Sequence, residues 1–218
     1  MTTDHPARQV IGLFGGSFDP VHVGHIAFMR SAETALRLTA MRLIPSGNSW
    51  QKPGQQTPPE HRRAMLELAT AKYANWVIDG QEIDRGGASY TVQTLESLRA
   101  ELGSEAALVL LIGSDQLHNL ATWHRYEDLL GLAHIAVTQR EQIPLHSFPP
   151  AIEQLLQTHG RDALDDAPCG NIVFFRMPAV AVSSTQLRKA LALHQPVDNL
   201  LDPAVLDYIR QHQLYSAG

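Results

Sequence analysis

The sequence predicts a doubly wound parallel α/β fold. Short apolar segments alternate with longer segments of helical periodicity along most of the chain. One segment, residues 106–112, is almost wholly apolar, which is typical of a central parallel strand covered on both faces. Such alternation favours a parallel sheet with right-handed crossovers, and in such folds ligands bind beyond the carboxyl ends of the strands. The loops after the first strand, after residues 106–112 and after the last strand are therefore the places to search.

The individual elements follow from periodicity and from turn residues. Strands are predicted at residues 10–14, 42–44, 76–78, 106–112, 135–138 and 172–175. Helices are predicted at about residues 22–36, from 58–60 onward, and at 91–102, 151–158, 185–193 and 203–212. In the helix that begins at Pro58-Pro59, we expect Ala64, Met65 and Leu68 to form the apolar face. The stretch 139–170 has prolines and acidic residues around one amphipathic piece at 151–158, and it is expected on the surface.

Composition excludes several classes of protein. The 218 residues are 44% hydrophobic, enough for a sizeable core, and the net charge of -5 without a basic run disfavours a nucleic-acid binder. The single cysteine, Cys169, excludes a disulfide framework and suits a reducing compartment. No secretory signal is seen, and no apolar stretch approaches the roughly 20 residues that span a bilayer. We therefore expect a cytoplasmic protein without a membrane segment.

The loop after the first strand has the composition of a phosphate site. It begins Gly15-Gly16-Ser17-Phe18 and ends with His22 and His25. Two glycines permit a tight turn and a close backbone approach, and the following helix start offers free N–H groups and a positive dipole end. His22 and His25 are three residues apart, so both rings lie on one face. Alternatively, the glycines form a simple turn and the histidines lie on the surface, or the two histidines bind a metal whose third ligand is missing.

This string resembles the H-x-G-H signature of the nucleotidyltransferase superfamily, with both histidines matched. The resemblance implies a Rossmann-like α/β fold that transfers a nucleotidyl group from a nucleoside triphosphate. The glycine spacing and the absence of Gly-Lys-Ser/Thr distinguish the loop from dinucleotide-binding and P-loop motifs.

A second string follows the last predicted strand. Ser183, Ser184 and Thr185 open a helix, and Arg188 lies one turn further, where its guanidinium can reach back to an anion. An ordinary N-cap with an exposed arginine is the alternative for this string alone. With Val182 and Leu187 as apolar replacements, it resembles the second superfamily signature, I-S-S-T-x-I-R. Two such strings in the expected order identify the superfamily.

The middle of the chain indicates the acceptor. Asp115 follows the most apolar strand, where it either orients ribose or metal-bound water or caps the next helix. The segments containing Tyr90-Thr91 and Trp123-His124 offer a helix start for a carboxylate and a flat aromatic face, although Trp123 is otherwise most simply a core residue. These segments resemble the S-Y-T and T-W elements of bacterial nicotinate-mononucleotide adenylyltransferases. The resemblance extends from Ile11 to the region of Tyr208 and Tyr215.

That resemblance implies a reaction of ATP with nicotinate mononucleotide that gives deamido-NAD and pyrophosphate, by direct attack of the mononucleotide phosphate. It implies catalytic roles for His22, His25 and Arg188. It implies ATP binding by Gly15, Gly16, Ser17, Phe18, His22, His25, Asp115, Ser183, Ser184, Thr185 and Arg188. It implies mononucleotide binding by Gly16, Ser17, Lys52, Tyr90, Thr91, Asp115, Trp123 and His124. Mg²⁺ is expected to be held through phosphates and water without direct protein ligands.

The same resemblance implies one nucleotidyltransferase domain over residues 1–218. It consists of an α/β core at 10–175 and a small C-terminal helical part at 182–218 that contains the phosphate-binding helix. A homodimer is left open, and no nucleic-acid or membrane partner is expected.

The loop at residues 46–53 departs from the family. It lacks the histidine of the usual P-P-H-[KR]-like segment, keeps a positive charge at Lys52 and adds Trp50, so its contact with the mononucleotide phosphate is open. The alternatives to the main prediction are another adenylyltransferase, such as the phosphopantetheine enzyme, and a non-catalytic nucleotide-binding regulator. A nucleic-acid-binding module is disfavoured by the net charge.

Overall fold

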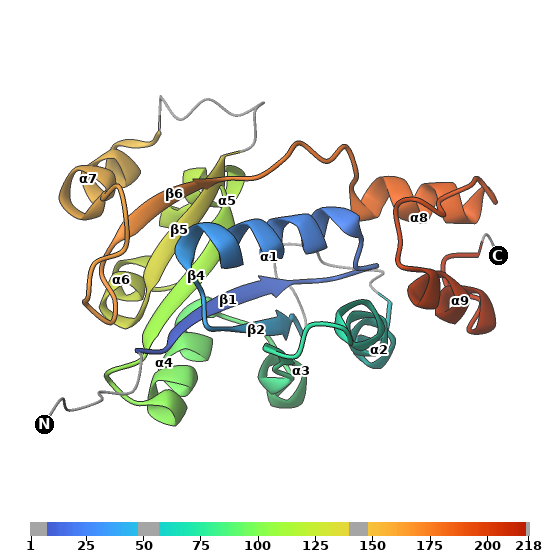
Figure 1. Cartoon of the computed structure of the whole chain (residues 1–218), viewed down its shortest axis with the longest axis horizontal. Helices are drawn as coiled ribbons and strands as arrows, with labels where there is room; N and C mark the ends of the chain where they lie inside the picture. The colour runs from blue at the N-terminus through green and yellow to red at the C-terminus, as the bar shows by residue number, and fades with distance from the viewer. Residues whose placement is uncertain (1–7, 48–56, 140–147, 217–218) are drawn as a thin grey trace, which may run out of the picture. The chain divides into compact units, whose positions relative to one another are not determined.

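Strands and helices alternate along the described part of the chain, residues 8–47, 57–139 and 148–216 of a computed structural model (Figure 1). The strands are β1 (Val10–Gly16), β2 (Ala40–Pro45), β3 (Trp76–Ile78), β4 (Ala107–Gly113), β5 (His134–Gln139) and β6 (Ile172–Arg176). The helices are α1 (Val23–Leu36), α2 (Pro59–Thr70), α3 (Gln81–Arg85), α4 (Thr91–Leu102), α5 (Ser114–His118), α6 (Leu129–Leu132), α7 (Pro150–His159), α8 (Ser184–Ala192) and α9 (Pro203–Gln211). Two 3₁₀ turns, η1 (Leu120–Thr122) and η2 (Tyr126–Asp128), lie between α5 and α6.

The strands form one sheet in the order β3-β2-β1-β4-β5-β6. The pairs β1–β4, β4–β5 and β5–β6 are parallel. On one side of the sheet, β2 and β3 follow outward from β1, and on the other side β5 and β6 follow outward from β4. This is the arrangement of a doubly wound fold. Every residue of β4 is buried, as its apolar sequence predicts. The predicted fold class is therefore confirmed.

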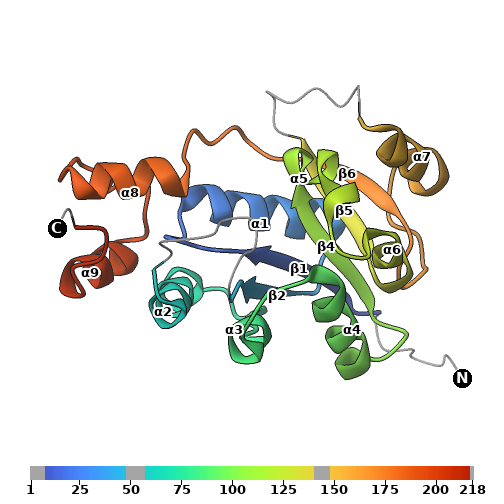
Figure 2. The same ribbon diagram turned by 180° about the vertical axis from the view of Figure 1, so that it is seen from behind.

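The chain divides into two compact units. Unit 1 comprises Met1–Leu13, Ala32–Met41 and Tyr90–Arg176, and unit 2 comprises Phe14–Ser31, Arg42–Ser89 and Met177–Gly218. In unit 1, β4, β5 and β6 lie side by side (Figures 1 and 2). The face of α4 that the sequence predicts, formed by Val92, Leu95 and Leu98, is buried there. The organisation of residues 1–218 as a single domain stays a prediction.

In unit 2, α2 packs against α9 (Figure 1). The buried side of α2 matches the predicted one in part: Met65 is fully buried, but Leu68 is 38% exposed, whereas Arg62 is 1% exposed and Leu66 is fully buried. The residues Arg62, Leu66 and Ala69 share the spacing of a helix face. The prediction was wrong for Leu68 because it did not place a charged arginine inside.

Two further expectations are corrected. The segment 139–170 is not wholly on the surface, because Phe148 and Ile152 are 7% and 0% exposed; residues 140–147 lie outside the described residues. The short helices α3, α5 and α6 and the two 3₁₀ turns were not predicted, since three to five residues are too few to show a helical period.

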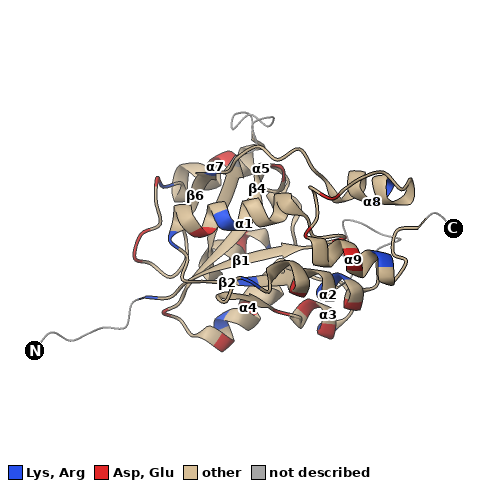
Figure 3. Cartoon of the chain, turned by 45° about the vertical axis from the view of Figure 1, so that its right-hand side comes forward, with Lys and Arg blue, Asp and Glu red and all other residues tan. Residues whose placement is uncertain are grey.

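Charges of both signs are interspersed over the described helices. Arginines are mixed with Asp and Glu along α2, α4 and α9 (Figure 3). Such mixing offers no basic face for a nucleic-acid backbone on these helices. Among the described residues, none of the helices has both the length and the apolar character needed to cross a bilayer.

Candidate active site

The first loop turns at a different residue from the one predicted. Strand β1 continues through Gly15 and Gly16, and the left-handed backbone belongs to Phe18, with φ of 49°. A Cβ at Gly16 would lie 3.3 Å from the Phe18 ring, so this glycine makes room for the phenylalanine. The Phe18 ring is fully buried and meets His25 edge to face at 5.3 Å. The tight turn therefore does not depend on glycine conformations, and Gly15 remains exposed.

The two histidines of this loop form a stacked pair. Their ring centroids are 3.8 Å apart with an angle of 24° between the planes, and His22 is only 7% exposed. The backbone N–H of His22 donates to Nδ1 of His25 over 3.2 Å. Because Nδ1 accepts this bond, the neutral ring of His25 carries its proton on Nε2. The pair therefore confirms that both rings lie on one face, and it makes Nε2 of His25 a hydrogen-bond donor.

The start of α1 is more fully bonded than the sequence suggests. The N–H of Val23 donates to the carbonyl of Leu200 over 3.1 Å, and that of His22 is taken by His25. These two N–H groups are not free for phosphate, so that part of the prediction was wrong. A Cβ at Gly24 would lie 2.9 Å from Cγ1 of Val182 and 3.1 Å from the His22 ring. The glycine thus lets the second signature string approach the first.

Helix α8 is bonded directly to the first loop. Ser183 is its N-cap, with Oγ accepting from the N–H of Gln186 over 3.2 Å. The hydroxyl of Ser184 donates to the carbonyl of Pro20 over 3.2 Å, and Nη1 of Arg188 donates to the carbonyl of Asp19 over 2.7 Å. Nη2 of Arg188 lies 3.5 Å from the hydroxyl of Thr185. The N-cap alternative thus holds for Ser183, while Ser184 and Arg188 join the two strings into one cluster.

Arg62 is a central residue of this cluster that the sequence analysis missed. Its guanidinium donates to four carbonyls over 2.7–3.1 Å: those of Ser17, Ser46, Gly47 and Thr57. Burial lowers the pKa of Arg62, while the nearby charge of Asp19 opposes that shift. The sequence signal that could have found it is the helical spacing of Arg62, Leu66 and Ala69, which places the arginine on the buried face of α2.

Metal binding by the two histidines gains no support from the geometry. Within residues 8–47, 57–139 and 148–216, no three His, Cys, Asp or Glu side chains are grouped to hold an ion. The ring planes of His22 and His25 stack nearly parallel, so their in-plane nitrogen lone pairs do not converge on one point. The carboxylate of Asp19 is occupied by donors from Tyr215 and Thr57.

Unit 1 holds five of the residues predicted for the acceptor, namely Tyr90, Thr91, Asp115, Trp123 and His124, whereas Gly16 and Ser17 belong to unit 2. The rings of Tyr90 and His124 are 4.6 Å apart, so the two predicted segments meet. Tyr90 is the N-cap of α4 and Thr91 is its first residue, as expected. Trp123 is half-buried, and its Nε1 is buried without a hydrogen-bond partner among the residues that the structure describes. A buried donor of this kind is costly unless a ligand or water pairs with it.

Asp115 is the second residue of α5, directly beyond the buried strand β4. The N-cap of this helix is Gly113, and no side chain caps it, so the capping alternative is wrong. The half-buried carboxylate accepts a bond from Nε2 of Gln116 over 3.1 Å. The neighbouring Oγ of Ser114 is fully buried and has no hydrogen-bond partner within the described part of the chain. Asp115 thus keeps acceptor capacity for a ligand.

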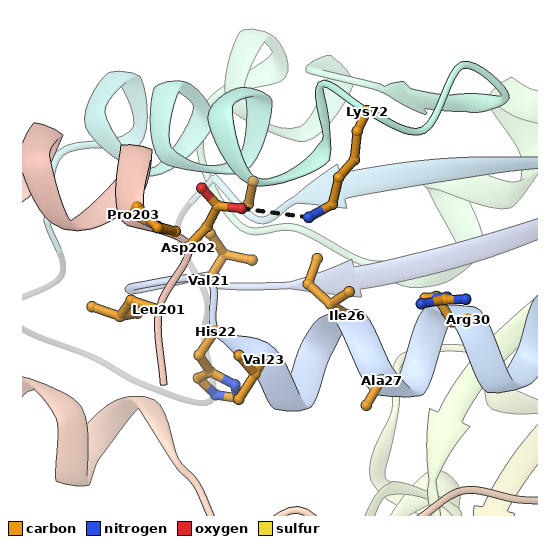
Figure 4. Close-up of a pocket in the computed structure, with 11 residues that line it drawn as sticks. Val21, His22, Val23, Ile26, Ala27, Arg30, Lys72, Leu201, Asp202 and Pro203 are labelled. Carbon is orange, nitrogen blue, oxygen red and sulfur yellow. Dashed lines mark ion pairs between the residues drawn. The ribbon is translucent and has the colours of Figure 1, made fainter. Parts of the chain in front are cut away.

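Among the described residues that were predicted for the site, only His22 lines a cavity of about 380 Å³ in unit 2 (Figure 4). It lies between α1, the end of α2 and residues 201–203, and His22 is at its edge. Its lining is mainly apolar, and Lys72 is paired with Asp202 over 3.6 Å. The residues predicted to bind phosphate are therefore gathered elsewhere, around the first loop and α8. Lys52 and Trp50 lie outside the described residues.

Comparison with known proteins identifies the family. A family model described as cytidylyltransferase-like matches residues 13–190, and the chain belongs to this family. A relative from Dechloromonas aromatica is 41% identical over 212 residues, which are 95% of this chain and 98% of the relative; another, from Laribacter hongkongensis, is 42% identical over 211 residues and 95% of each chain. Both are named probable nicotinate-nucleotide adenylyltransferase. Within the family, the chain therefore belongs with the nicotinate-nucleotide adenylyltransferases, as the resemblance predicted.

Solved structures agree on the fold. A nicotinic acid mononucleotide adenylyltransferase of Plasmodium falciparum, complexed with NaAD, superposes with a TM-score of 0.70. The superposition covers 95% of this chain and 98% of that one, at 17% sequence identity. The same enzyme complexed with APC gives a TM-score of 0.72.

Proposed function

We propose that this protein transfers the adenylyl group of ATP to nicotinate mononucleotide, a step of NAD biosynthesis. A phosphate oxygen of the mononucleotide attacks the α-phosphorus of ATP, and the bond to the β-phosphate breaks. The products are deamido-NAD and pyrophosphate. Family membership supports this reaction. The observation that carries it is the bonded cluster of His22, His25, Ser184 and Arg188 in unit 2.

No general base is required in this reaction. The second pKa of a phosphate monoester is about 6, so the mononucleotide phosphate is already a dianion at neutral pH. Catalysis then consists of holding the reacting atoms in line and stabilising the charge that moves onto pyrophosphate. The donors of the cluster suit that task.

On the ATP side, each residue contributes a donor. His25 presents the N–H of Nε2, and Arg188 has five N–H groups, of which the contacts to Asp19 and Thr185 engage two. Ser184 and Thr185 open α8, where anions are favoured by the helix dipole. We assign the phosphates of ATP to these side chains and to the backbone of Gly15, Gly16, Ser17 and Phe18, together with His22 and Ser183.

On the mononucleotide side, we assign binding of the aromatic ring and its carboxylate to unit 1. The helix start at Tyr90 and Thr91 favours a carboxylate, and Trp123 offers a ring face and an unpaired donor. His124 lies against Tyr90, and Asp115 keeps acceptor capacity for ribose. We assign nicotinate mononucleotide to these residues, with Lys52, Gly16 and Ser17 on its phosphate. Nicotinate should be preferred over nicotinamide, because the amide NH₂ would face donors.

Mg²⁺ enters this proposal with ATP as part of the substrate. When bound, the ion neutralises charge on the phosphate oxygens. The described residues do not group into a direct binding site for it, so no step is routed through the ion. We further propose a single domain that works in the cytoplasm, where its free thiol at Cys169 stays reduced.

The test is pyrophosphate release from ATP and Mg²⁺ with three acceptors offered separately: nicotinate mononucleotide, nicotinamide mononucleotide and phosphopantetheine. We expect release with the first and much less with the second. Release only with phosphopantetheine would keep the ATP cluster and overturn the acceptor. ATP binding without release in any of the three would favour the non-catalytic regulator.

A further inference from the structure

The C-terminal segment of unit 2 holds the first loop at four points. Ser184 and Arg188 donate to the carbonyls of Pro20 and Asp19, and the carbonyl of Leu200 accepts the N–H of Val23. The fourth point is Tyr215, whose hydroxyl donates to Oδ1 of Asp19 over 2.6 Å. Of the four C-terminal residues that make these contacts, only Ser184 and Arg188 belong to a signature string. The contact from Tyr215 is the shortest of the four, and it comes from near the end of the chain.

The residue that receives this contact is buried and charged. Asp19 is 2% exposed, and its second oxygen accepts the N–H of Thr57 over 3.2 Å. A buried carboxylate requires such donors, because it has lost its hydration. The backbone carbonyl of the same residue accepts the bond from Arg188. A shift of Asp19 therefore moves an atom that helps to orient the Arg188 guanidinium.

Tyr215 is built into this arrangement at some conformational cost. Its backbone is left-handed, with φ of 63°, a region that bulky residues rarely adopt unless their surroundings impose it. Burial and the hydrogen bond to Asp19 both raise the pKa of the phenol, so it remains a protonated donor throughout the neutral range. The tail is thus folded so that one hydroxyl reaches one carboxylate.

We propose that Tyr215 is a positioning residue, which holds Asp19 and thereby aligns the phosphate-binding loop with Arg188 for adenylyl transfer. The inference rests on the proposed function for its kinetic part. It adds to the two signature strings a third segment, the C-terminal tail, which acts through Asp19. Removing the hydroxyl leaves a buried carboxylate oxygen with one donor fewer, and the loop then relaxes toward other donors.

The test compares Tyr215→Phe with Tyr208→Phe in the full chain. Tyr208 is a matched control. Its hydroxyl also forms a hydrogen bond with one side chain, at 2.9 Å from Nδ1 of His61, but it does not contact the first loop. We expect kcat with ATP and nicotinate mononucleotide to fall about tenfold in Tyr215→Phe and to stay within about twofold in Tyr208→Phe. Thermal unfolding of both variants, followed by circular dichroism, shows whether a fall in kcat comes from general destabilisation of the fold. Equal kcat values in two folded variants would overturn the inference.

A second readout does not depend on turnover. Calorimetric binding of ATP to the free protein should weaken several-fold in Tyr215→Phe and remain unchanged in Tyr208→Phe. If the wild-type protein binds ATP but releases no pyrophosphate, the proposed function fails while this comparison still decides the role of Tyr215. Unchanged ATP affinity in Tyr215→Phe would then refute that role. Adding Asp19→Asn to Tyr215→Phe should lower affinity less than the product of the two single effects, because both changes remove one contact.

Discussion

The two groups of candidate residues differ in how closely their members bond to one another. In unit 2, the residues around the first loop bond chiefly to one another: Arg62 to four carbonyls, Arg188 to Asp19, and Asp19 to Tyr215. In unit 1, Tyr90 and His124 meet through their rings, and Nε1 of Trp123 is buried without a hydrogen-bond partner among the described residues. The cluster in unit 2 is thus fixed by bonds among its own residues, although Oγ of Ser46 beside it is also buried without such a partner.

This difference fits the two substrates. The phosphates of ATP carry several charges, and preorganised donors stabilise moving charge without reorganising during the reaction. Nicotinate mononucleotide must be distinguished from close analogues, and buried polar groups left unpaired by the wrong ligand give strong selection. We therefore interpret unit 2 as the group that supports catalysis and unit 1 as the group that selects the acceptor.

The largest expected effect breaks the donor cluster. His25→Ala removes the Nε2 donor, and kcat should fall about 100-fold to 1000-fold while the KM for ATP changes little. Steady-state pyrophosphate release measures both values. His194→Asn is the control, since His194 is exposed and has a left-handed backbone that asparagine tolerates. A normal kcat in His25→Ala would exclude His25 from the reaction.

The next effect concerns how the cluster is held. Arg62→Met leaves four carbonyls without their donor, and we expect the free energy of unfolding to fall by about 3 kcal/mol. Arg63→Met, on the same helix, loses only an exposed pair with Glu67 and should change stability by about 0.5 kcal/mol or less. Urea denaturation measures both. Similar stabilities of the two variants would contradict the central place of Arg62.

A smaller effect tests the group in unit 1. Trp123→Phe keeps a ring but removes the unpaired Nε1 donor, and the KM for nicotinate mononucleotide should rise about tenfold with the KM for ATP unchanged. Initial rates at varied concentrations of each substrate give both constants. An unchanged or lower KM for the mononucleotide would mean that this donor stays unpaired in the complex as well.

The smallest effect depends on pH and separates structural from catalytic histidines. Burial lowers the pKa of His134, which is fully buried in β5 and has Nε2 at 2.8 Å from the carbonyl of Ala167. The unfolded chain therefore binds this proton more readily, so stability is full above about pH 6.5 and is lost as the pH falls below it, by at most about 1.4 kcal/mol per pH unit. Melting temperatures between pH 7.5 and 5 should show this slope. His134→Gln should flatten it, and an unchanged slope would assign the titration to another group.

Much of the fold followed from local patterns. The apolar run of β4 and the face of α4 are readable because each depends on neighbouring residues alone. The two signature strings also lie in short segments, so His22, His25, Ser184 and Arg188 could be named in advance. Their assigned binding and catalytic roles stay predictions.

The remaining features depend on contacts between distant segments. Arg62 reaches carbonyls up to 45 residues away, and Tyr215 reaches Asp19 across 196 residues. Nothing in the local sequence shows such partners. The turn at Phe18 was missed for a related reason: Gly15 and Gly16 are the usual residues of a tight turn, but packing of the Phe18 ring decides the loop.

In the proposed reaction, His25 is a donor and the mononucleotide phosphate is the only nucleophile. The stereochemical course at the α-phosphorus tests this most directly, with ATP that carries a chiral thiophosphate at that position. A single in-line displacement predicts inversion of configuration in the thio-substituted deamido-NAD. Retention would require two displacements through a covalent intermediate on the protein, and it would contradict the account.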